Sequence, residues 1–100
     1  MNTVPLKKVT LVAEAVLEPR IISELKRLGA TGYTVSEVHG EGSRGVRASE
    51  WEGENVMVET LVGAATADRI LAHVAAEYFE HYAVIAYLTD VHVVRGDKYL

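Results

Sequence analysis

Cysteine is absent from this 100-residue sequence, and proline occurs only twice. Without cysteine the chain can form no disulfide, no thiolate metal site and no cysteine nucleophile, and the absence agrees with a reducing compartment. Apolar runs fall short of the roughly 18 residues that suggest a membrane span. No signal peptide is expected, because Glu14 and Glu18 interrupt the first apolar stretch. We therefore expect a cytoplasmic protein.

Basic residues are also few. Ten lysines and arginines stand against fourteen aspartates and glutamates, which gives a net charge of −4. Because nucleic-acid binding requires a basic face, we exclude a nucleic-acid partner. The four histidines lack the spacing of metal ligands, and no serine lies in a nucleophile-elbow sequence. The sequence thus predicts no metal site and no catalytic centre of its own.

Apolar residues, by contrast, are abundant and make up 49% of the chain. A chain of this length forms one domain by default, so we expect a single domain over residues 1–100. A chain this short has little core in which to bury so many apolar side chains. We therefore expect part of the apolar surface to contact another subunit.

Hydrophobic patterning predicts strands and helices in two similar halves. Strands are expected at 8–17, 33–39, 55–62 and 82–88, with one helix at 19–28 and another capped by Thr66. Gly29 should end the first helix in a left-handed conformation. The strand at 82–88 is apolar on both faces, which is typical of a buried strand. Thr89 and Asp90 predict a tight turn into a short strand at 91–95.

This order of elements predicts an α+β fold. The arrangement is a ferredoxin-like βαββαβ sandwich with a short extra C-terminal strand. A long loop separates the second and third strands. It covers residues 40–53, reads GEGSRGVRASEWEG, and has neither helical nor strand periodicity. Its glycines match G-x-G-x-x-G, but no helix is expected after them, so a dinucleotide-binding fingerprint is excluded.

The same loop is suited to bind a phosphate group. Glycines such as Gly42 let the backbone approach an anion, and Ser43 can donate a hydroxyl hydrogen bond. Arg44 and Arg47 offer planar charged groups that match phosphate oxygens. The alternative is that both arginines pair with nearby glutamates, and each such surface pair is worth about 0–1 kcal/mol. An exposed indole is costly, so Trp51 either folds back onto the domain or docks on a partner.

A family resemblance begins at the junction between the second strand and the loop. Residues 32–42 read GYTVSEVHGEG, which resembles the PII signalling superfamily. The continuation at residues 42–47, GSRGVR, is similar to the PII-like branch known as SbtB, which accompanies the sodium-dependent bicarbonate transporter of cyanobacteria. The resemblance extends from Lys8 to Tyr99.

The resemblance implies a homotrimer that binds adenine nucleotides between neighbouring subunits. The implied ligands are cyclic AMP, AMP and ADP, with ATP also considered, and no cofactor is required. The implied nucleotide contacts are Thr34, Gly42, Ser43, Arg44, Arg47, Tyr82, Ala83, Val84, Arg95 and Gly96. A T-loop at about residues 41–54 would change order with the ligand and contact the transporter, which would be the only link to a membrane. The implied partner contacts are Val46, Ala48, Ser49, Glu50, Trp51 and Glu52.

One segment departs from the PII pattern. Residues 80–83, EHYA, contain neither the glycine nor the lysine of the classical phosphate loop, so a single phosphate suits the site better than a triphosphate. The missing C-terminal cysteine pair of some SbtB proteins argues against redox control and the linked hydrolysis. Three functions are open: a nucleotide-responsive regulator that is not an enzyme, a slow nucleotide phosphohydrolase, and a plain oligomerisation module. The residues favour the regulator.

Overall fold

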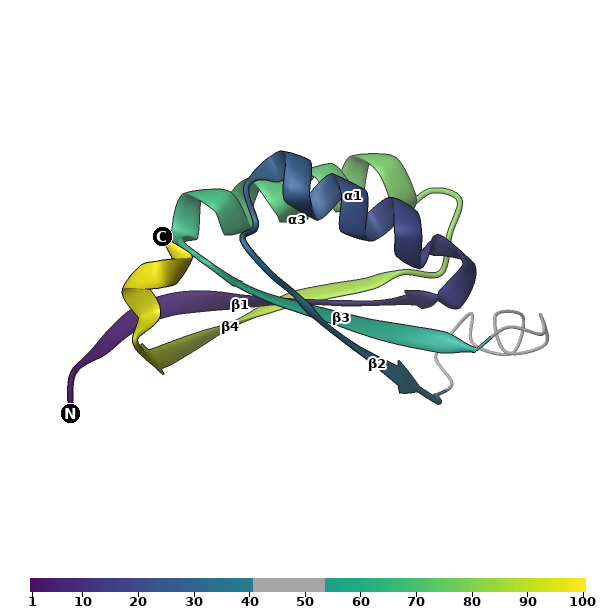
Figure 1. Ribbon diagram of the computed structural model, residues 1–100. Coiled ribbons are helices and arrows are strands. Elements are labelled where there is room, and N and C mark those ends of the chain that lie inside the picture. Colours follow the sequence, from purple (N-terminus) through teal and green to yellow (C-terminus); the bar gives the residue numbers. More distant parts are fainter. Residues whose placement is uncertain (41–53) are drawn as a thin grey trace.

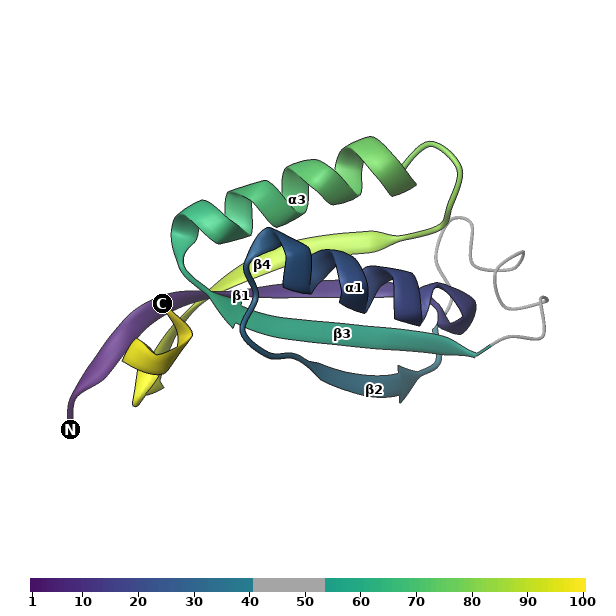
Figure 2. The same ribbon diagram turned by 45° about the horizontal axis from the view of Figure 1, so that its top comes forward.

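The computed structural model describes residues 1–40 and 54–100. These residues form a four-stranded antiparallel sheet in the order β2-β3-β1-β4, with α1 and α3 packed on one face (Figures 1 and 2). The elements in chain order are β1 (Thr3–Glu14), the 3-10 helix η1 (Ala15–Leu17), α1 (Glu18–Leu28), β2 (Thr34–Val38), β3 (Asn55–Val62), α3 (Ala64–Tyr78), β4 (Ile85–Val94) and the 3-10 helix η2 (Gly96–Tyr99). The predicted α+β, ferredoxin-like fold is confirmed.

The core lies between the sheet and the two helices. On β3 every second residue is buried, as expected for a strand with one covered face. Central β1 contributes Val9, Leu11 and Ala13 to the same layer. The residues that α1 and α3 bury recur every three or four positions, which is the period of one helical face. They are Ile21 and Leu25 of α1, and Ala67, Ile70, Val74 and Tyr78 of α3.

The first helix follows the sequence prediction closely. Pro19 lies in its first turn, where the missing N–H has no intrahelical partner. Gly29 ends the helix at φ 116°, a left-handed conformation that costs glycine little. Its N–H donates to the carbonyls of Leu25 and Lys26. None of the described helices is long and apolar enough to cross a membrane.

Two predicted boundaries are wrong. The first strand runs from Thr3 to Glu14, not over 8–17, because the backbone from Thr3 onward pairs with β4. The chain then turns into η1, and the N–H of Ala15 donates to the carbonyl of Glu54. Helix α3 begins at Ala64 with Gly63 as its N-cap, so Thr66 lies inside the first turn, where its hydroxyl accepts a hydrogen bond from Arg69.

The C-terminal strand differs most from the prediction. Strand β4 is continuous from Ile85 to Val94, so the expected turn and the separate strand at 91–95 are wrong. Thr89 and Asp90 stay extended because they pair with Lys8 and Lys7 of β1, and Asp90 also forms an ion pair with Lys7. The strand is also not buried: it forms one edge of the described sheet. Exposed apolar side chains lie along it, namely Ile85, Tyr87, Leu88 and Val94.

Candidate functional site

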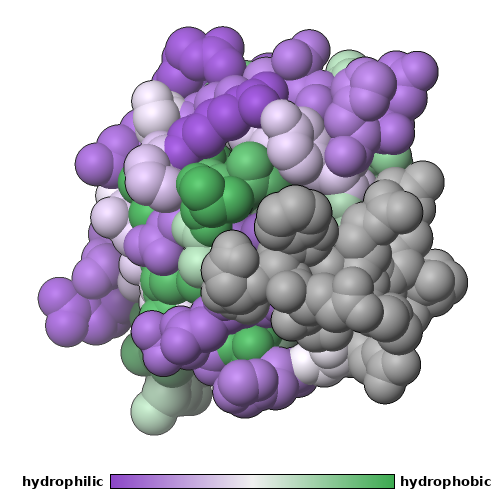
Figure 3. Space-filling view, turned by 90° about the vertical axis from the view of Figure 1, so that its right-hand side faces the viewer, coloured by the Kyte–Doolittle hydropathy of each residue, from purple (hydrophilic) through white to green (hydrophobic). Residues whose placement is uncertain are grey.

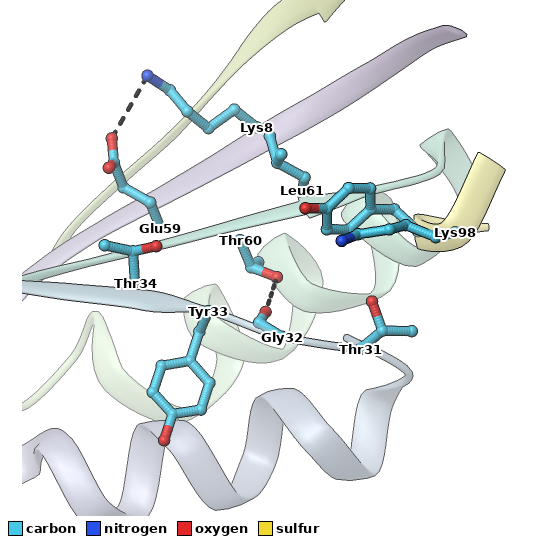
Figure 4. A pocket seen from close by; sticks show the side chains of 10 residues that line it. Lys8, Thr31, Gly32, Tyr33, Thr34, Glu59, Thr60, Leu61 and Lys98 are labelled. Carbon is cyan, nitrogen blue, oxygen red and sulfur yellow. Dashed lines mark hydrogen bonds and ion pairs between the residues drawn. The ribbon is translucent and has the colours of Figure 1, made fainter. Parts of the chain in front are cut away.

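A hollow of about 520 Å³ opens beside the start of β2. Its walls come from β1, β3, the segment before β2 and the C-terminal turn η2 (Figure 4). The lining residues are Lys8, Thr31, Gly32, Tyr33, Thr34, Glu59, Thr60, Leu61, Lys98 and Tyr99. The hollow therefore combines two lysine ammonium groups, a carboxylate, threonine hydroxyls and two tyrosine rings. Such a set can hydrogen-bond a polar ligand, pair with an anion and pack against a planar base.

Two contacts hold the walls of this hollow together. Thr60, buried on β3, donates a hydrogen bond of 2.6 Å from its hydroxyl to the carbonyl oxygen of Gly32. This bond ties the segment before β2 to the centre of the sheet. Across the sheet, Lys8 Nζ lies 3.3 Å from Glu59 Oε2 (Figure 4). Both side chains are about one-third exposed, so either can exchange its partner for a ligand at little cost.

Strand register places Thr34 in one row of residues that crosses the whole sheet. Thr34 of β2 pairs with Glu59 of β3, Glu59 with Thr10 of β1, and Thr10 with Tyr87 of β4. Directly paired residues share a face, and this row lies on the face away from the helices. The Thr10 side chain is fully buried there, and its hydroxyl has no hydrogen-bond partner in the described chain.

The nucleotide contacts expected from the sequence are divided between the two edges of the sheet. Thr34 lies in the hollow at the β2 edge, whereas Tyr82, Ala83 and Val84 precede β4 at the opposite edge. Three strand spacings separate these edges, roughly 14 Å. Within one chain, therefore, the structure does not bring the two groups together.

Arg95 and Gly96 have clear backbone roles. Arg95 adopts a left-handed conformation, φ 63°, and turns the chain from β4 into η2. Gly96 is buried against β1, and an added Cβ would lie 2.8 Å from Cβ of Val4. Only glycine fits there, and the tight approach sets the position of η2, which carries Lys98 and Tyr99 into the wall of the hollow.

The remaining predicted contacts lie outside the described residues. They are Gly42, Ser43, Arg44 and Arg47 for the nucleotide, and Val46, Ala48, Ser49, Glu50, Trp51 and Glu52 for the partner. The described residues on either side of this segment are close together, because Val38 and Asn55 form the last pair of β2 and β3.

Sequence reasoning missed several residues that line the hollow. Lys8 and Glu59 meet only because β1 and β3 pair in a particular register. Alternation along each strand could have placed both on the polar face, but it could not have paired them. Lys98 and Tyr99 belong to the tail, which carried no pattern that predicted a contact with this site.

Comparisons with known proteins agree with this fold. The family model of the nitrogen regulatory protein P-II matches residues 6–98. A PII-like signalling protein from Thermus thermophilus is 57% identical over 100% of both chains, with a TM-score of 0.88. CPII from Thiomonas intermedia, bound to ADP and bicarbonate, is 24% identical over 99% of this chain and 98% of its own, with a TM-score of 0.85. The B. subtilis GlnK–ATP complex is 20% identical over 87% and 82%, with a TM-score of 0.65.

Proposed function

The chain belongs to the nitrogen regulatory protein P-II family and is a PII-like signalling protein, and we propose that it binds adenine nucleotides in the clefts between the subunits of a homotrimer. The proposed ligands are AMP and ADP, with cyclic AMP and ATP as further candidates. We propose that the protein acts as a regulator and not as an enzyme.

One observation carries this proposal: the two groups of expected ligand contacts lie at opposite edges of one sheet. Thr34 and the hollow belong to the β2 edge, and 82–84 belong to the β4 edge. We propose that the ligand contacts both groups by bridging two chains, with the β2 edge of one subunit facing the β4 edge of the next. The exposed apolar side chains of β4, including Ile85 and Tyr87, supply the surface for such a contact.

In the proposed complex, the hollow holds the base and ribose. Thr34 and Glu59 offer hydroxyl and carboxylate oxygens, and Tyr99 offers an aromatic surface. The neighbouring subunit contributes the backbone of Tyr82, Ala83 and Val84, with Arg95 and Gly96 near the ligand. Gly42, Ser43, Arg44 and Arg47 gather around the phosphate. The ADP and AMP bound to CPII, and the ATP bound to GlnK, are consistent with a nucleotide as the ligand class.

The partner that we propose is a membrane transporter of the sodium-dependent bicarbonate class, as in the SbtB branch. The T-loop at about residues 41–54 would contact it through Val46, Ala48, Ser49, Glu50, Trp51 and Glu52. The protein would then act from the cytoplasm and reach the membrane only through the transporter. Nucleotide binding changes which loop conformation is favoured, provided that the conformations differ in nucleotide affinity.

Calorimetry with the purified protein tests nucleotide binding. AMP, ADP, ATP and cyclic AMP are titrated into wild type, into the double variant Arg44→Ala/Arg47→Ala, and into Arg27→Ala, a control that removes one arginine from an exposed position on α1. We expect the double variant to bind at least about tenfold more weakly, since each charge-assisted hydrogen bond contributes roughly 1.5–3 kcal/mol. The control should bind as wild type does. The proposal is contradicted if wild type binds none of the four nucleotides at millimolar concentration. It is also contradicted if the double variant binds them with unchanged affinity.

A further inference from the structure

A polar network joins the two helices at a distance from the hollow. Glu24 of α1 accepts a hydrogen bond of 2.5 Å from the hydroxyl of Tyr78, at the end of α3, and one of 3.1 Å from Arg20 Nε. The guanidinium of Arg20 also lies 4.5 Å from the centre of the Tyr78 ring and 3.8 Å from a carboxylate oxygen of Glu77. His73 Nε2 lies 3.1 Å from Glu24 Oε1.

Burial and hydrogen bonding together determine which group in this network is ionised and which one donates. The Tyr78 side chain is almost fully buried, and Glu24 is only 17% exposed. Burial acts to raise the pKa of Glu24, but the hydrogen bonds from Tyr78 and Arg20, with His73 close by, outweigh it and lower that pKa. Burial and the bond to Glu24 raise the pKa of Tyr78 well above its ordinary value, so its hydroxyl stays a donor. The carboxylate therefore fixes the position of the Tyr78 ring.

The network leads directly to the turn between α3 and β4. The carbonyl of Tyr78 accepts hydrogen bonds from the backbone N–H groups of His81 and Tyr82, at 3.2 and 2.9 Å. The rings of Tyr78 and Tyr82 pack at 5.7 Å between centroids. In Figure 1 this turn lies at the right-hand end of the molecule. That end faces the viewer in Figure 3, where hydrophobic side chains reach the surface between polar ones. The position of Tyr82 thus depends on Tyr78 through both backbone and side chain.

Stability alone is a poor explanation for such a group. This cluster is partly buried, since the side chains of Arg20 and Glu77 are 40% and 51% exposed. Its exposed ion pairs contribute little to stability, and desolvation offsets the attraction at the buried ones. What the cluster does provide is a fixed position for the side chains in it, because each hydrogen bond admits only a narrow range of distances and angles. The geometry fixed here is that of the turn that starts the β4 edge.

We infer that Glu24 and Tyr78 are positioning residues for the Tyr82–Val84 wall of the nucleotide site. This inference rests on the proposed function, because that wall is half of the proposed cleft. Glu24 and Tyr78 do not touch the nucleotide. They hold the backbone of residues 82–84 where it can meet a ligand bound against the neighbouring chain.

Two conservative variants test the inference. Tyr78→Phe removes the hydroxyl and keeps the ring, and Glu24→Gln removes the charge and keeps the shape. We expect each to weaken ADP binding about fivefold, the scale of one hydrogen bond. Because both act through the same bond, the double variant should lose little more than either alone. Hydrogen exchange at the amides of Tyr82, Ala83 and Val84 should become faster in each variant, in the absence of nucleotide.

Val74→Ala is the matched control. Val74 is buried on the same helix, outside the network, so its truncation lowers thermal stability but should leave ADP affinity and exchange at 82–84 unchanged. If wild type binds ADP and the variants Tyr78→Phe and Val74→Ala bind it equally well, this inference is wrong, whereas the proposed function is unaffected. Unchanged exchange at 82–84 in Tyr78→Phe overturns the inference as well. If wild type binds no nucleotide, the proposed function is wrong. The hydrogen-exchange measurement at residues 82–84 then still shows whether the network holds the turn.

Discussion

Strands β1 and β4 pair over ten residues but are buried to very different extents. Leu11 of β1 is 1% exposed, whereas Leu88 of β4 is 38% exposed, although both point toward the helices. On the other face Thr10 is fully buried, while its pair Tyr87 is 46% exposed. The two sequences are similarly apolar. The difference arises from position: β1 has β3 on its second side, and β4 has no described strand there.

This comparison shows that an apolar strand sequence predicts a covered strand, but not what covers it. For β1 the cover is its own chain. A long apolar edge is a risk for a soluble protein, and natural sheets usually protect such edges. The opposite edge, β2, is five residues long and carries exposed Thr34, Ser36 and Glu37. We therefore expect the cover of β4 to come from another copy of the chain.

The largest expected effect comes from placing a charge on the β4 edge. Ile85 is 54% exposed in the single chain, so Ile85→Asp should leave the subunit folded. At a subunit contact, however, a buried unpaired carboxylate is strongly unfavourable. We expect light scattering to show a homotrimer for wild type and a monomer for the variant. Ala72→Asp, which adds the same charge to an exposed position on α3, should remain trimeric. A monomeric wild type, or a trimeric Ile85→Asp variant, would argue against the contact.

A matched pair of leucines gives the next effect. Leu11→Ala should lower the free energy of unfolding by about 2–5 kcal/mol, because it leaves a cavity in the core. If β4 is covered only in the oligomer, the loss in Leu88→Ala should depend on protein concentration, whereas the loss in Leu11→Ala should not. Denaturant unfolding at several protein concentrations measures both. Equal, concentration-independent losses would mean that Leu88 is a core residue of the single chain.

Local signals in the sequence were sufficient for much of the fold. The bounds of β3 were predicted correctly, because apolar residues alternate along it and the flanking residues break the pattern. Pro19 and Gly29 marked the ends of α1 through their own backbone preferences. These elements are determined by residues that are neighbours in the chain, and this explains why a single sequence is enough to find them.

Contacts between distant parts of the chain were not predictable in the same way. Thr89 and Asp90 have turn-like composition, yet pairing with β1 keeps them extended, and the partner of Asp90 is 83 residues away. The hollow depends on the β1–β3 register, which sets Lys8 beside Glu59. The bond between Tyr78 and Glu24 spans 54 residues. Thr34 was found only because the resemblance to a family supplied it.

The smallest expected effect concerns the end of the molecule where β4 begins. The fold holds the pKa of Glu24 below its ordinary value of 4.5, so the ionised carboxylate stabilises the folded state above that pH. This contribution is lost as the pH falls through the lowered value. Wild type should therefore be more stable than Glu24→Gln near neutral pH, and the difference should shrink with acidification below about pH 4.5.

Urea unfolding at a series of pH values measures this difference, and Tyr78→Phe supplies the control background. Without the hydroxyl of Tyr78, one of the bonds that lower the pKa of Glu24 is missing, so the pH-dependent gap between Glu and Gln should narrow. A gap that is the same with and without that hydroxyl would mean that Arg20 and His73, and not Tyr78, stabilise the carboxylate. The start of β4 would then depend on apolar packing and on the backbone hydrogen bonds to the carbonyl of Tyr78, and not on its hydroxyl.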